Sequence, residues 1–111
     1  MTLEEITTEI EKDADARTLY PSRVADLIVL LGVKYSRAVD NYMVCKAEYA
    51  QEFSKRREEF KSDTSCERQL DYEEIGLKLS HWKYQTKKAE MLVNTLKGYL
   101  YQKNSEARNE T

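Results

Sequence analysis

Apolar residues recur every seven positions from about residue 22 to residue 61, in alternating steps of four and three. This spacing is typical of a helix that packs as a coiled coil. No proline interrupts the stretch, and its glycine, Gly32, lies outside the series. At about 1.5 Å per residue, roughly forty residues predict a rod of about 60 Å, which needs a partner along its seam. The series consists of Val24, Ile28, Leu31, Tyr35, Ala38, Tyr42, Cys45 and Tyr49.

A second series with the same spacing lies between about residues 70 and 104. The small polar residues 62–65 separate the two series and predict a turn at about residues 63–68, with Cys66 in or beside it. Two matching seams joined by a short turn predict an all-α fold with an antiparallel helical hairpin over residues 20–104. The second series consists of Ile75, Leu79, Trp82, Thr86, Ala89, Val93, Leu96 and Leu100.

Residues 1–19 are expected to form an acidic N-terminal helix or arm, in which six acidic residues outnumber two basic ones. Thr2 and Glu5 have the spacing of a capping box. Leu3, Ile6 and Ile10 make one apolar stripe, which predicts a helix to about residue 12. Two interpretations remain open: a solvated amphipathic helix that packs on the hairpin, or an acidic arm that competes with nucleic acid or engages a basic partner.

The boundaries of the hairpin follow from local residue types. Tyr20 and Pro21 interrupt the helical pattern, and Ser22 is the expected N-cap of the first long helix. The residues after Lys103 are polar, so residues 105–111 are expected to form a flexible tail.

Some large apolar side chains lie outside both seams and predict a second apolar surface. We therefore expect the chain to form a homo-oligomer in which several hairpins lie side by side. The residues expected on this surface are Leu27, Leu30, Leu77, Leu92 and Tyr99.

The sequence predicts neither an enzyme nor a cofactor or metal site. His81, the single histidine, has no nucleophile at a recognisable spacing. Cys45 and Cys66 lack metal-ligand spacing and are expected to be free thiols. No run of eighteen apolar residues and no basic leader is present, so a cytoplasmic protein without membrane contact is expected.

Basic residues gather near the end of the first long helix: Lys55, Arg56, Arg57 and Lys61. One interpretation is a solvated helix end whose cations interact favourably with the helix dipole. The other is a patch that grips phosphates of single-stranded DNA, with Phe53 or Phe60 available for base stacking. The net charge of −2 does not mark the whole chain as a polyanion binder.

The sequence resembles the UvsY-type recombination mediators of tailed phages. Residues 1–6 (MTLEEI) and 9–13 (EIEKD) are similar to the start of that family, and residues 34–35 (KY) to its lysine–aromatic pair. Residues 55–60 (KRREEF) are similar to its basic segment, and the helix through residues 77–97 to its C-terminal helix. The segment between the helices is shorter here, and residues 98–103 (GYLYQK) replace the ending typical of the family.

The resemblance implies an oligomeric helical protein that holds single-stranded DNA, displaces a single-strand-binding protein and helps to load a recombinase. Lys55 and Arg57 match the DNA-binding motif of the family, whereas Arg56 and Lys61 are added from charge and proximity. The expected location is then the cytoplasm of an infected host cell. The alternative is a helical protein–protein interaction module, a phage adaptor or an inhibitor of a host protein, that does not bind DNA.

Overall fold

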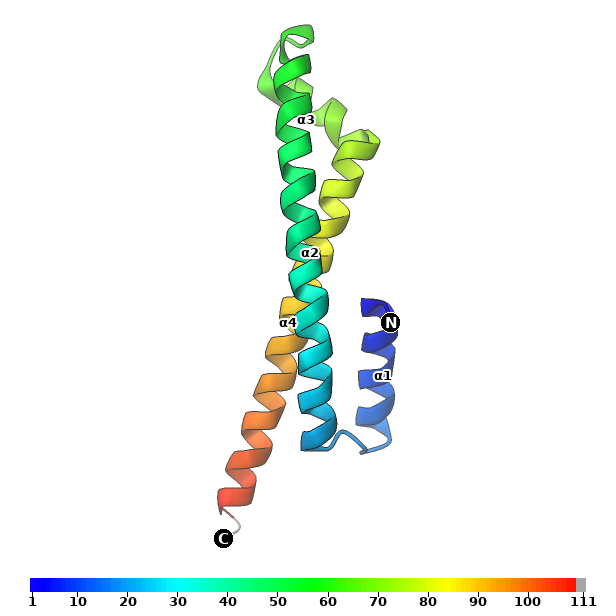
Figure 1. Cartoon of the computed structure of the whole chain (residues 1–111), viewed down its shortest axis with the longest axis vertical. Helices are drawn as coiled ribbons and strands as arrows, with labels where there is room; N and C mark the ends of the chain where they lie inside the picture. Colours follow the sequence, from blue (N-terminus) through cyan, green and yellow to red (C-terminus); the bar gives the residue numbers. More distant parts are fainter. Residues whose placement is uncertain (110–111) are drawn as a thin grey trace. The chain divides into compact units, whose positions relative to one another are not determined.

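The computed structural model describes residues 1–109, and within them the chain is all-α. The elements in order are α1 (Leu3–Asp15), α2 (Pro21–Arg56), the 3-10 turn η1 (Arg57–Glu59), α3 (Asp63–Tyr72) and α4 (Glu74–Asn109) (Figure 1). The long helices α2 and α4 pack antiparallel. The prediction of a short N-terminal helix followed by an antiparallel helical hairpin is therefore confirmed.

The chain divides into two compact units, and each long helix contributes to both. The first unit contains residues 1–36 together with α4 from Lys87 onward, and the second contains residues 37–86. Each unit has its own set of buried apolar side chains.

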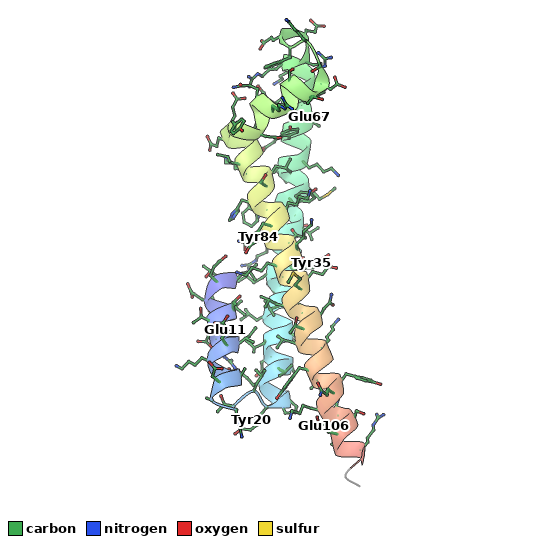
Figure 2. All side chains as sticks on the ribbon, turned by 180° about the vertical axis from the view of Figure 1, so that it is seen from behind. Glu11, Tyr20, Tyr35, Glu67, Tyr84 and Glu106 are labelled. Atoms are coloured by element: carbon green, nitrogen blue, oxygen red, sulfur yellow. The ribbon has the colours of Figure 1, made fainter. Side chains whose placement is uncertain are left out.

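In the first unit, α1 lies beside the first turns of α2 and packs through its apolar side. Leu3 is 4% exposed and Ile6 is fully buried, whereas Glu11 on the same helix is exposed (Figure 2). The Thr2 hydroxyl accepts a hydrogen bond from the Glu5 amide at 3.1 Å, as the capping spacing predicts. Of the two interpretations of the acidic segment, the structure shows the amphipathic helix that packs on its own hairpin.

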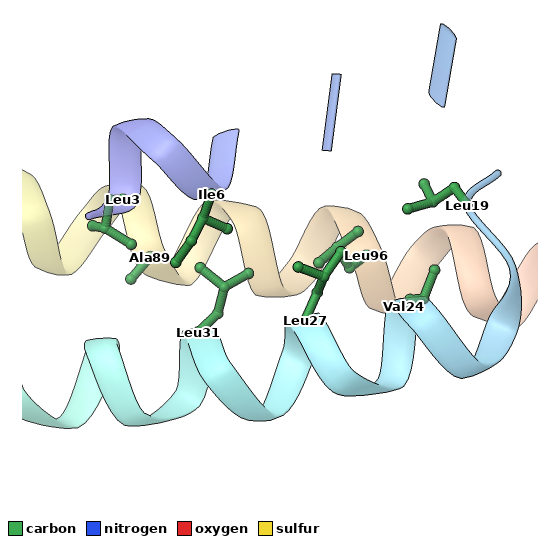
Figure 3. Packing of buried hydrophobic residues seen from close by; sticks show 8 residues of the cluster. All are labelled: Leu3, Ile6, Leu19, Val24, Leu27, Leu31, Ala89 and Leu96. Atoms are coloured by element: carbon green, nitrogen blue, oxygen red, sulfur yellow. The ribbon is translucent and has the colours of Figure 1, made fainter. Parts of the chain in front are cut away.

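Three helices and the connection between α1 and α2 supply the core of the first unit (Figure 3). Side chains from α1 and from the first turns of α2 meet small and aliphatic residues of α4. Because α1 covers a second side of α2, this part of α2 is apolar on more than one side. The core consists of Leu3, Ile6, Leu19, Val24, Leu27, Leu31, Ala89 and Leu96.

The expected second apolar surface is wrong at Leu27, which is only 1% exposed. The reason is that α1, not a second hairpin, covers that side of α2. Leu30, Leu92 and Tyr99 are half-buried and pack against the same core. Only Leu77 of the five residues is exposed, at 60%, and it lies in the second unit.

A Schellman motif ends α1, three residues later than expected, at Asp15. The Thr18 amide donates to the Asp13 carbonyl oxygen at 2.8 Å, and the Arg17 amide donates to the Ala14 carbonyl oxygen at 3.2 Å. This motif needs a left-handed residue at Arg17, whose φ is 58°. Glycine is usual at that position because it has no Cβ to clash, so an arginine there is strained.

We expect Arg17→Gly to stabilise the protein by about 0.5–1 kcal/mol, because glycine adopts the left-handed conformation without steric cost. Urea denaturation followed by circular dichroism measures the change. Arg17→Ala is the matched control and should leave stability within about 0.5 kcal/mol of the wild type, since alanine keeps the Cβ. Equal stability of the glycine and alanine variants would contradict this account of the α1 terminus.

The second unit uses the two predicted seams. On α2, Ala38 is 2% exposed and Cys45 is 7% exposed. On α4, Ile75, Leu79 and Trp82 are half-buried. Both cysteines are free thiols, and Cys66 is fully buried on the inner face of α3.

The expected turn at residues 63–68 is wrong, because α3 occupies it. Ser62 is the N-cap of this helix, and its hydroxyl accepts a hydrogen bond from the Ser65 amide at 3.1 Å. Cys66 and Leu70, four residues apart, form its buried face. The small polar residues therefore start a helix instead of forming the turn.

Helix ends differ from expectation at three further places. α2 begins at Pro21, a favoured first helical residue, so Ser22 lies inside the first turn and is not the N-cap. α2 ends at Arg56 instead of near Lys61. α4 continues with exposed side chains through residues 105–108 and ends at Asn109, so this part of the expected tail is helical. The remainder of that tail, residues 110–111, lies outside the described residues.

Candidate nucleic-acid interface

The four candidate DNA-binding residues follow one another through a change of backbone direction in the second unit. Lys55 and Arg56 form the last turn of α2, Arg57 begins η1, and Lys61 precedes the N-cap of α3. Helix α2 ends here because the chain tightens into a 3-10 turn, and Phe60 leaves it in an extended conformation. The structure thus places all four residues at the junction between α2 and α3.

Arg56 is held by carboxylates. Its guanidinium forms a hydrogen-bonded ion pair with Glu73, and Glu52 and Glu59 lie 3.8 Å and 3.9 Å away. The hydrogen bond that Arg56 donates to Glu73 raises the pKa of Arg56. The same guanidinium lies 5.9 Å from the centre of the Phe60 ring. Arg56 therefore ties the end of α2 to the start of α4.

Arg57 also has partners within the segment. Its guanidinium pairs with the Asp63 carboxylate, and its Nη1 donates to the Phe60 carbonyl oxygen at 2.8 Å. Asp63 is the first residue of α3, so this arginine connects η1 to the following helix. A phosphate that binds Arg57 must displace that carboxylate.

Lys55 and Lys61 are different, because both side chains are exposed and neither forms an ion pair with any described residue. A lysine in this state can approach a phosphate without first losing a protein partner. The candidate patch thus consists of two available ammonium groups and two occupied guanidinium groups.

The surroundings of Arg56 are acidic. A cavity of about 570 Å³ beside it is lined by four glutamates. Lys78, another lining residue, pairs with Glu74 at 3.2 Å, and this hydrogen bond raises the pKa of Lys78. Because carboxylates repel phosphate, this cavity does not extend the basic patch. The glutamates are Glu48, Glu52, Glu73 and Glu74.

Tyr49, a seam residue of α2, binds one more carboxylate of the second unit, that of Asp71. Its hydroxyl donates a hydrogen bond to the Asp71 carboxylate at 2.9 Å. Burial and this hydrogen bond raise the pKa of Tyr49 to about 12. The contact joins α2 to α3 and is structural, because the phenol remains protonated far above neutral pH.

The described residues contain no group of three or more histidine, cysteine or acidic side chains that could hold a metal ion. His81 packs edge-on against Trp82, with ring centres 4.9 Å apart. None of the helices described is both long enough and apolar enough to cross a membrane.

The sequence interpretation missed the acidic partners of the patch. Glu52, four residues before Arg56 on the same helix, was visible as a helical ion-pair spacing. Glu73 and Asp63 were not, because their contacts depend on how α3 folds back beside the end of α2. Comparisons with protein families, curated proteins and solved structures found no match.

Proposed function

We propose that this chain binds single-stranded DNA as an oligomer and assists the loading of a recombinase by displacing a single-strand-binding protein. The observation that carries the proposal is the pair Lys55 and Lys61, whose exposed ammonium groups have no protein carboxylate to displace. The resemblance of residues 55–60 and of both long helices to UvsY-type mediators supports the same function.

The mechanism is electrostatic. Lysine ammonium groups bind a strand by replacing counterions that are condensed on its phosphates. Two such groups on one chain bind weakly, so several copies must act together on one strand. Arg56 and Arg57 strengthen the contact only where phosphate replaces Glu73 or Asp63, which a guanidinium can bind in the same planar geometry.

Fluorescence anisotropy with labelled oligo-dT tests the proposal. We expect the double variant Lys55→Ala, Lys61→Ala to lose about tenfold or more in affinity at low salt, because about two phosphate contacts per chain disappear. The matched control is Lys46→Ala with Lys83→Ala, which removes two exposed lysines from the same unit and should change affinity much less. Equal losses in both double variants would contradict a specific role for Lys55 and Lys61.

A variant that is expected to bind more tightly provides a second test, because misfolding can lower the affinity for oligo-dT but does not raise it. Glu73→Gln removes the strongest partner of Arg56 while keeping the shape of the side chain. We expect several-fold tighter binding of oligo-dT, since one more cation becomes available to phosphate. Unchanged binding in this variant would show that the strand does not reach Arg56.

Exposed apolar side chains favour a second candidate function, a helical protein–protein interaction module that acts as a phage adaptor or inhibits a host protein. Leu77 and Tyr84 are 60% and 58% exposed and lie seven residues apart on one face of α4, away from its seam. Two results together would favour this function over strand binding. A protein partner stays bound to the wild type after nuclease treatment but does not bind the double variant Leu77→Glu, Tyr84→Glu. In addition, oligo-dT does not bind the wild type.

A further inference from the structure

The connection between α1 and α2 faces the last third of α4 across a cavity of about 560 Å³ in the first unit. This volume lies within the range of small-molecule sites in proteins. Figure 2 shows Tyr20 on the connection itself. The residues around the cavity are Ala14, Arg17, Leu19, Tyr20, Pro21, Tyr99 and Lys103.

The cavity is lined by two cations and two phenol rings, and no carboxylate is among its lining residues. This composition is unusual in a chain whose acidic residues outnumber its basic ones. The nearby Asp13 carboxylate is held by Arg23 at 3.0 Å, which raises the pKa of that arginine, and by the Thr18 hydroxyl at 3.4 Å. The cavity therefore favours an anion over a cation.

Contacts on each side fix the cavity walls before any ligand binds. The Tyr99 hydroxyl donates a hydrogen bond to the Leu19 carbonyl oxygen at 2.8 Å, which joins α4 to the connection. The Lys103 ammonium lies 5.7 Å from the centre of the Tyr99 ring. Its ion pair with Glu106, at 3.6 Å, is half-exposed and thus readily exchanged for a stronger anion.

Arg17 reaches the cavity from the strained left-handed position at the end of α1. It forms no ion pair with any residue in the described part of the chain. A strained residue is a reason to look for function, and here the strain coincides with an unpaired guanidinium at a cavity. Pro21, the first residue of the 36-residue helix α2, adds the positive end of a helix dipole to the same wall.

We propose that this cavity binds a nucleotide, with the base stacked on Tyr20 and the phosphate held between Arg17 and Lys103. Tyr20 is 61% exposed, so its ring is free to accept a planar base. Arginine and lysine supply charge-assisted donors to the phosphate. The proposal is independent of strand binding at Lys55 and Lys61, which lie in the other unit.

Two sources share this chemistry: a free mononucleotide and the phosphorylated end of a DNA strand. Two-dimensional amide NMR of the full chain distinguishes them with dAMP, deoxyadenosine, inorganic phosphate and 5′-phosphorylated oligo-dT as separate ligands. We expect dAMP to shift the amides of residues 14–20 and 99–103. Deoxyadenosine and phosphate should each bind about tenfold more weakly, because each keeps only part of the contacts.

Variants assign the binding to the cavity. Arg17→Gly with Lys103→Ala should weaken dAMP binding at least about tenfold, since both charge-assisted contacts are lost while glycine suits the backbone at residue 17. Lys97→Ala, an exposed lysine on the same helix outside the cavity, is the matched control. If the oligonucleotide binds there and free dAMP does not, the ligand is a strand end.

Three results would overturn the proposal. The first is no amide shift in residues 14–20 or 99–103 with either nucleotide ligand at about 10 mM, where even binding worth about 3 kcal/mol is visible. The second is phosphate alone binding as tightly as dAMP, which would leave no role for the ring. The third is unchanged dAMP affinity in the Arg17→Gly, Lys103→Ala variant.

Discussion

Replacing Gly76 with alanine is expected to destabilise the second unit by about 3 kcal/mol, as overpacking of a closely packed site does. A Cβ at this position would lie 2.3 Å from the Leu70 carbonyl oxygen and 2.6 Å from the Asp71 Cα. Both atoms belong to the backbone of α3, so no side-chain rotation relieves the overlap. The glycine is needed here for space and not for an unusual φ.

Urea denaturation of Gly76→Ala measures this cost. The matched controls are Gly32→Ala and Gly98→Ala, because a Cβ at either position meets no atom within 4 Å. Both are exposed residues inside long helices, where alanine is favoured over glycine by about 0.5–1 kcal/mol, so both controls should be stabilised. A Gly76→Ala variant as stable as these controls would show that α3 does not pack closely on α4.

Replacing Leu27 with alanine is expected to cost about 2–4 kcal/mol of stability, the usual penalty for emptying a leucine site in a core. Leu27 is 1% exposed and belongs to the core that α1 completes. Because this burial occurs within one chain, the loss should be the same at every protein concentration. A residue at an interface between copies would give a loss that depends on concentration.

Thermal or urea unfolding at several protein concentrations separates the two cases. Leu77→Ala is the control, since Leu77 is 60% exposed and its truncation should change stability by less than about 0.5 kcal/mol. A Leu27→Ala variant with native stability in the monomer would contradict the packing of α1 on the hairpin.

The hairpin was predictable because its information is periodic. Residues such as Ala38 and Cys45 on α2, and Ala89 and Leu96 on α4, fall at seam positions and are buried in the structure. The seam does not hold at Tyr35, which is 37% exposed. The seven-residue repeat therefore identified the long helices and the faces through which they pack. It could not show which seam residues are fully buried and which remain partly exposed.

The errors occur where one residue pattern has two structural outcomes. A run of serine, threonine and aspartate marks either a turn or a helix start, and only the burial of Cys66 and Leu70 identifies α3. Leu27 lies outside the seam, and it is buried by α1, whose packing on the hairpin was one of two open interpretations of the sequence. Arg17 occupies a position where glycine is the usual signal, so the end of α1 was placed too early.

The candidate site was predictable in position but not in electrostatics. The sequence shows four cations within seven residues, and the structure pairs two of them with acids. The Arg56–Glu73 pair joins residues seventeen apart in the chain, which no local spacing reveals. The sequence thus gives the number of charged groups in a cluster, but the fold determines how many of them are available to a ligand.

The most direct test of strand binding is the salt dependence of the affinity for labelled oligo-dT. For single strands the slope of log affinity against log salt is about −0.7 for each phosphate contact. With Lys55 and Lys61 as the available cations, we predict that the wild type binds oligo-dT at low salt. In the Lys55→Ala, Lys61→Ala variant the slope should become shallower by about 1.4 for each chain bound to the strand, because two phosphate contacts are lost. Absence of binding at low salt, or the same slope in wild type and variant, would contradict the account.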